Sequence, residues 1–67
     1  MVTLTPLGRT KAEQMGSGPQ ADILASLYEN SGPMEADDIA LDTGMAVEKV
    51  VMVCKRLAKD RLIESTR

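Results

Sequence analysis

The stretch TGMAVEKVVMVCKRLAKDRLIES, residues 43–65, contains the clearest structural signals of this chain. Gly44 lies in the tight turn that opens it, where the absence of a Cβ permits a positive φ. The pattern beyond the turn predicts a helix over 47–60, because apolar side chains recur every three or four residues: Val47, Val50, Val53 or Cys54, Leu57 and Ala58. Residues 62–65 are predicted to be extended and to follow this helix directly.

A short helix is expected just before the turn. Asp37 and Asp38 lie in its first turn, where the helix dipole favours negative charge. Ile39 and Ala40 are predicted to face inward, with Leu41 as a third candidate.

A longer helix is expected before that one. Ser17 and Gln20 have the spacing of a capping box, and Pro19 fits the first helical position. Gly32 is the expected left-handed residue at its end, and Pro33 stops any continuation. Its predicted apolar face consists of Ile23, Leu24, Leu27 and Tyr28.

The N-terminal segment predicts a short strand followed by a short helix. Residues 1–5 alternate apolar and β-branched polar side chains. Thr5 is the expected N-cap and Pro6 the first residue of a helix that extends to about residue 15, weakened by Gly8. Gly16 and its neighbours then break this helix.

Length and composition limit what the chain can be. Sixty-seven residues predict one domain, 1–67, with the strand and short helix in 1–16 and the main helical core in 17–64. Tyr28 is the single aromatic residue, so the core must be aliphatic. The chain contains no apolar run near the roughly 20 residues that span a bilayer, and no signal-peptide pattern. Its single cysteine, Cys54, excludes an intramolecular disulfide and favours a cytoplasmic location.

The net charge of −2 argues against a protein that coats nucleic acid through bulk charge. A local basic patch remains compatible with that value, so the distribution of charge matters more than its sum.

The order of these segments resembles the winged helix-turn-helix family of DNA-binding domains, as in small prokaryotic or archaeal-type transcriptional regulators. The residues that carry the resemblance are 33–40, 43–45, Val50, Cys54, Leu57, Leu62 and Ile63, and it covers about two thirds of the chain. It implies a mainly α fold with a three-helix core, in which Met45 fills the space between the last two helices. It also implies transcription regulation, with 47–60 as the recognition helix.

The chain departs from the family pattern at three places. Ala46 stands where a Ser or Thr commonly caps the recognition helix, and Arg61 stands where Gly often precedes the wing. Too few residues follow Leu62 to form a two-stranded wing. However, 4–9 (LTPLGR) is similar to the segment that follows the last wing strand in several winged regulators. We therefore expect Val2 to Thr5 to pair antiparallel with about 62–66, which forms a minimal two-stranded sheet from the N- and C-terminal strands. The alternative is a frayed N-terminus.

The predicted DNA-binding residues lie in and just after the long helix: Lys49, Met52, Lys55, Arg56, Lys59 and Arg61. The four basic residues of the helix are expected to contact phosphates, with Arg61 and Arg67 near the wing, while Lys49 and Met52 approach base edges. A solvated helix face is the alternative explanation for these charges.

A second class of function fits the same fold. A winged-helix protein–protein interaction module that does not bind nucleic acid is supported by the acidic pI of 4.9, by Ala46, and by a small apolar patch if Val51 and Met52 are exposed. A homodimer is compatible with either function.

Other candidate sites are weaker. Cys54 is expected to be a packed thiol, and Tyr28 to belong to the core rather than to stack on a base. The acidic cluster of Glu35, Asp37, Asp38 and Asp42 suits a helix N-terminus better than a cation site. With no His, no phosphate-binding loop and no nucleophile paired with a base, the sequence predicts no enzyme, no metal and no cofactor.

Overall fold

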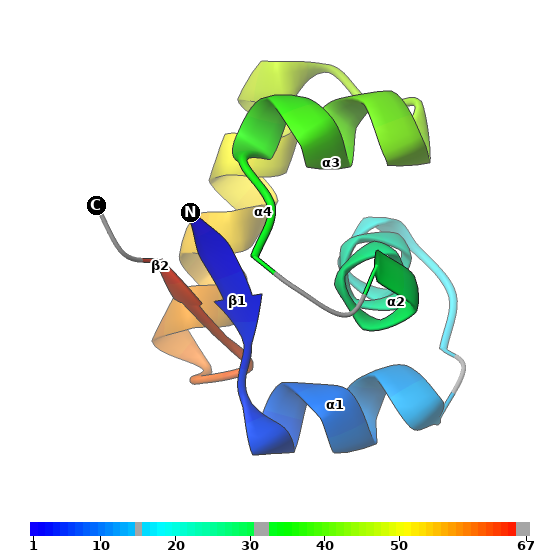
Figure 1. Ribbon diagram of the computed structural model, residues 1–67, viewed down its shortest axis with the longest axis vertical. Helices are drawn as coiled ribbons and strands as arrows, with labels where there is room; N and C mark the ends of the chain where they lie inside the picture. Colours follow the sequence, from blue (N-terminus) through cyan, green and yellow to red (C-terminus); the bar gives the residue numbers. More distant parts are fainter. Residues whose placement is uncertain (15, 31–32, 66–67) are drawn as a thin grey trace.

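The computed structural model describes residues 1–14, 16–30 and 33–65. Within these residues the elements follow the order β1 (Val2–Leu4), α1 (Pro6–Glu13), α2 (Pro19–Asn30), α3 (Ala36–Thr43), α4 (Val47–Lys59) and β2 (Ile63–Ser65). Figure 1 shows the sheet along one side of the molecule with α4 behind it, and α1 and α3 at opposite ends. The expected layout, mainly helical with a minimal antiparallel sheet, is confirmed.

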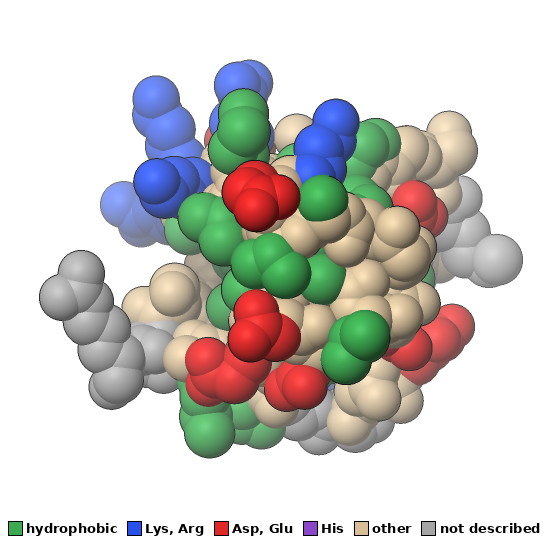
Figure 2. Space-filling view, turned by 90° about the horizontal axis from the view of Figure 1, so that it is seen from above, with side chains coloured by type: hydrophobic (Ala, Val, Ile, Leu, Met, Phe, Trp, Pro, Cys, Tyr) green, Lys and Arg blue, Asp and Glu red, His purple; other side chains and the backbone are tan. Residues whose placement is uncertain are grey.

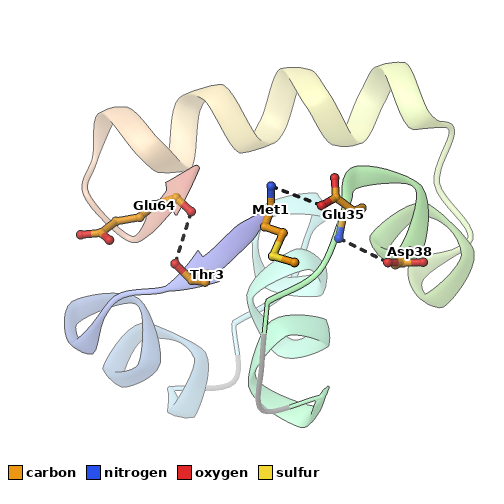
Figure 3. A network of polar contacts seen from close by, with 5 residues as sticks. All are labelled: Met1, Thr3, Glu35, Asp38 and Glu64. Carbon is orange, nitrogen blue, oxygen red and sulfur yellow. Dashed lines mark hydrogen bonds and ion pairs between the residues drawn. The ribbon is translucent and has the colours of Figure 1, made fainter. Parts of the chain in front are cut away.

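The sheet joins the two ends of the described chain. β1 and β2 are antiparallel, and Val2 lies opposite Ser65, Thr3 opposite Glu64 and Leu4 opposite Ile63. The Thr3 hydroxyl also donates to the Glu64 carbonyl at 3.4 Å (Figure 3). The predicted pairing of the N-terminal and C-terminal strands is therefore confirmed, although Thr66 and Arg67 lie outside the described residues.

β1 has a second partner that the sequence did not predict. The amide of Val2 donates to the carbonyl of Met34 at 2.7 Å, and the amide of Met34 donates back to Val2 at 2.9 Å. The N-terminal amine lies 3.3 Å from the Glu35 carboxylate (Figure 3). β1 is thus held on both edges, by β2 and by the segment that leads into α3.

The core is aliphatic and receives side chains from three helices and the sheet. Its fully buried members are Ile23, Leu27, Ile39, Val50, Leu57 and Ile63. Met45 is partly buried and packs against this cluster.

Three residues predicted to face the core lie at its edge or outside it. Leu41 is 85% exposed, because successive helix residues are about 100° apart and Leu41 lies about 200° from the buried Ile39. Val47 is also exposed, since Val50 and Leu57 decide which side of α4 turns inward. Tyr28 is 39% exposed, and its hydroxyl donates to the Glu13 carboxylate at 3.1 Å. The expectation that Tyr28 belongs to the core is wrong.

α1 begins as predicted, and its first turn is hydrogen-bonded to Leu62, just before β2. Thr5 is its N-cap and accepts from the Gly8 amide at 3.0 Å, with Pro6 in the first turn. The same hydroxyl lies 2.9 Å from the Leu62 carbonyl oxygen, which also accepts from the Thr5 amide at 3.2 Å. A Cβ on Gly8 would overlap that oxygen, so glycine is required where α1 crosses Leu62.

The remaining helix ends are also decided by local residues. α2 starts at Pro19, and the Asp22 amide bonds to Gly18, so Gly18 rather than Ser17 takes the cap position. The predicted end at Gly32 lies outside the described residues. Gly44 ends α3 with φ of 77°, as the sequence predicts.

Candidate nucleic-acid interface

The orientation of α4 is fixed by its buried residues. Val50 and Leu57 are fully buried, and Val53, Cys54 and Ala58 pack partly against the core. The opposite side of the helix turns outward, at intervals of three or four residues. Four exposed side chains form this outward stripe: Glu48, Met52, Lys55 and Lys59.

Two more basic residues flank the outward stripe. Lys49 and Arg56 are exposed along one edge of α4, about two helical turns apart. The Arg56 guanidinium lies 3.9 Å from the Asp60 carboxylate, a distance at which an exposed pair contributes little. Arg56 therefore keeps most of its capacity to bind an anion. The structure brings all the predicted basic residues of α4 to its exposed surface.

Arg61 lies just beyond the end of α4, in an unusual conformation. Its φ is 61°, in the left-handed region where glycine is preferred. The Arg61 amide donates to Ala58 at 3.0 Å, and the Leu62 amide donates to Leu57 at 2.9 Å, which is the bond pair of a Schellman C-cap. This turn directs the chain into β2 and leaves the Arg61 side chain exposed. Arg67 lies outside the described residues.

Charge is unevenly distributed over the molecule. Residues 12–46 contain seven acidic and no basic side chains, whereas 47–61 contain five of the eight basic residues of the chain. Figure 2 shows the Lys and Arg side chains gathered toward the top of the view, with most Asp and Glu side chains below and beside them. The exposed side of α4 and the turn after it thus form a basic surface on an acidic domain, a signal that was present in the sequence.

Apolar side chains are exposed beside this basic surface. Met52 is 69% exposed within the outward stripe, and Val47 and Val51 are exposed along one edge of α4. The sequence predicts an apolar patch on this helix if Val51 and Met52 are exposed, and both are exposed in the structure. α4 also begins without a side-chain cap, because Ala46 offers no hydrogen-bonding group.

Two acidic residues of α3 have structural partners. The Asp38 carboxylate accepts from the Glu35 amide at 3.3 Å, at the start of α3 (Figure 3). The Asp42 carboxylate accepts from the buried Ser26 hydroxyl at 2.6 Å, which ties α3 to α2. Within 1–14, 16–30 and 33–65, acidic, Cys and His side chains form no cluster of three that could hold a metal ion.

Cys54 and Tyr28 lie away from the basic surface. Cys54 is half-buried on the inner side of α4, and this burial raises the pKa of its thiol. The Arg9 guanidinium lies 5.8 Å from the centre of the Tyr28 ring, and both residues line a hollow of about 390 Å³ with Leu4 and Pro33. That hollow lies between α1, α2 and β1, apart from the outward stripe.

None of the described helices is both long and apolar enough to cross a membrane. Comparisons with protein-family models, with curated proteins and with solved structures found no match.

Proposed function

We propose that this protein is a winged-helix DNA-binding protein that regulates transcription in the cytoplasm, by binding and not by catalysis. The observation that carries the proposal is the basic exposed surface of α4 on an otherwise acidic domain. A protein that docks on a polyanion needs such a concentration of cations, and its net charge can still be negative.

The shape of α4 supports the same function. The helix spans Val47–Lys59, and its outward stripe is free of covering elements within the described residues. A single α-helix fits the major groove of B-DNA, which is about 12 Å wide. In that position Lys55 and Lys59, on the outward stripe, and Lys49 and Arg56, at its edge, all lie within reach of phosphates.

The acidic residues restrict how the domain can approach DNA. α2 and α3 would be repelled by phosphates, which favours an approach through the α4 side. Arg61 then lies next to β2, where it extends the basic surface toward the sheet. One small module offers a limited contact area, roughly 600–1,000 Å², and a homodimer on two half-sites would double it.

A second candidate function has its own observation. The exposed Val47, Val51 and Met52 form an apolar patch on α4, and Met adapts readily to different protein surfaces. Ala46 also lacks the hydroxyl that would cap the helix and contact a phosphate. These features favour a protein partner on the same helix, with the winged-helix fold used as an interaction module.

A DNA titration at several salt concentrations separates the two functions. Four phosphate contacts from α4 predict a slope of log affinity against log salt of about −3 to −4. The double variant Lys55→Ala/Arg56→Ala should reduce the steepness of that slope by about 2. The control is Arg9→Ala/Lys11→Ala, which removes the same charge from exposed positions of α1.

The outcome is decisive in each case. Equal weakening by the two double variants would mean that bulk charge, and not the α4 surface, determines binding. Absence of binding at low salt would reject the DNA function and leave the interaction module. In a chemical-shift map of the same titration, the amides of α4 should respond first.

A further inference from the structure

One carboxylate lies among the cations of α4. Glu48 is the first residue of the outward stripe, ahead of Met52, Lys55 and Lys59, and it is exposed. Among the described residues the ion pairs within 4.0 Å are Met1 with Glu35 and Arg56 with Asp60, so Glu48 has no cationic partner. Its charge opposes the approach of the basic surface to phosphates.

A purely local role accounts for part of this placement. α4 begins at Ala46 without a side-chain cap, and a carboxylate in the first turn interacts favourably with the helix dipole. That role does not require Glu48 to lie on the outward stripe, because any position of the first turn would serve. On the stripe, the carboxylate faces whatever α4 binds.

The major groove offers few groups that a carboxylate can accept from. Guanine presents only acceptors there, and thymine presents an acceptor and a methyl group. Adenine presents an amino group beside the N7 acceptor, which repels a carboxylate. Cytosine presents its N4 amino group with no acceptor on the same base. Cytosine is therefore the base whose groove edge fits a carboxylate.

We propose that Glu48 selects a cytosine in the DNA target, and that Met52 contacts the methyl group of a nearby thymine. The inference rests on the proposed DNA-binding function. Glu48 and Met52 are about 6 Å apart along the helix axis, and bases are about 3.4 Å apart along a strand. The two side chains thus face base pairs one or two steps apart. Lys55 and Lys59, further along the stripe, supply attraction to phosphates without base preference.

Selection from a random-sequence DNA duplex library at low salt tests this proposal. The wild-type protein should enrich cytosine at one position by about 5- to 100-fold over the other bases. The variant Glu48→Gln should shift that position to adenine, because an amide pairs with adenine N6 and N7. The variant Glu48→Ala should lose the preference, while its affinity for the unselected library stays equal or rises.

The control is Glu29→Gln, which makes the same chemical change at an exposed position of α2. It should keep the cytosine preference of the wild type. Thermal unfolding of each variant verifies that it is folded during selection. If wild type and Glu48→Gln select the same bases, Glu48 does not read DNA, and the proposed function stands without it. If wild type binds no duplex, both proposals fall.

Discussion

Replacement of Gly8 by alanine reverses the effect expected from helix propensity. Within a helix, glycine to alanine ordinarily stabilises a protein by about 0.5–1 kcal/mol. In this structure the new Cβ would overlap the Leu62 carbonyl oxygen and lie 2.8 Å from its carbon. Because both are backbone atoms, no side chain can move to relieve the contact. α1 and the segment before β2 must separate.

The magnitude follows from what this separation breaks. The Leu62 carbonyl accepts from the Thr5 amide at 3.2 Å and lies 2.9 Å from the Thr5 hydroxyl. Two such hydrogen bonds contribute about 1–3 kcal/mol, and the strain of overpacking adds about 1–3 kcal/mol. After the gain in helix propensity, we expect a net loss of about 2–4 kcal/mol. A domain of this size has a total stability of about 3–10 kcal/mol.

Urea unfolding followed by circular dichroism measures this loss. With an m value of about 1 kcal/mol per molar urea, the midpoint should fall by about 2 M or more. The matched control is Gly16→Ala, because the nearest atom to its Cβ would be Ala21 Cβ at 3.7 Å. That control should change stability by less than about 1 kcal/mol. A midpoint for Gly8→Ala at or above the wild-type value would refute the reasoning.

Three other predictions concern single side chains. Arg61→Gly should raise the free energy of unfolding by about 1 kcal/mol, because a φ of 61° is unfavourable for a residue with a Cβ and not for glycine. Arg61→Ala keeps the Cβ and should give no such gain in the same urea titration. Ser26→Ala should lower stability by about 1–3 kcal/mol through loss of the 2.6 Å bond to Asp42, and a double-mutant cycle with Asp42→Ala should show coupling between the two sites. Burial raises the pKa of the Cys54 thiol, so its alkylation should be slower in the folded protein than in urea at the same pH, and equal rates would contradict this. The free energy of unfolding should also decline as the pH rises past the ordinary thiol pKa, because the thiol of the unfolded chain loses its proton at a lower pH than the thiol of the folded protein.

The sequence predicted those parts of the fold that local signals determine. Gly44 ends α3 and Thr5 starts α1 because a glycine at positive φ and a capping hydroxyl act on their own turn. The pairing of β1 with β2 could also be predicted, because too few residues follow Leu62 to form a wing and residues 4–9 resemble a segment that follows a wing strand.

The sequence did not predict features that depend on contacts between distant segments. Gly8 suggested only a weaker helix, whereas its role is to let α1 approach Leu62. The bridge between Val2 and Met34 is one residue pair and leaves no periodic pattern. Leu41 and Tyr28 fit the apolar pattern of their helices, but the width of the buried face depends on which elements pack there.

The exposure of the basic side chains in the candidate site could largely be predicted from the sequence. A buried stripe through Val50 and Leu57 places the basic residues of α4 outward, and the structure has them there. The DNA-binding residues predicted from the sequence did not include Glu48. Its place at the head of the outward stripe emerges once the orientation of α4 is known.

The closure of the sheet has a consequence for the order of folding. Thr3 and Glu64 are in contact although 61 positions separate them in the chain. During synthesis on a ribosome, β1 leaves the exit tunnel before β2 does and can pair with the segment at Met34 first. One edge of β1 stays open until residues 63–65 emerge, and such an edge is prone to pair with other chains. Native pairing of distant segments also slows folding relative to a bundle with local contacts. The domain should therefore complete its fold late, when β2 becomes available to pair with β1.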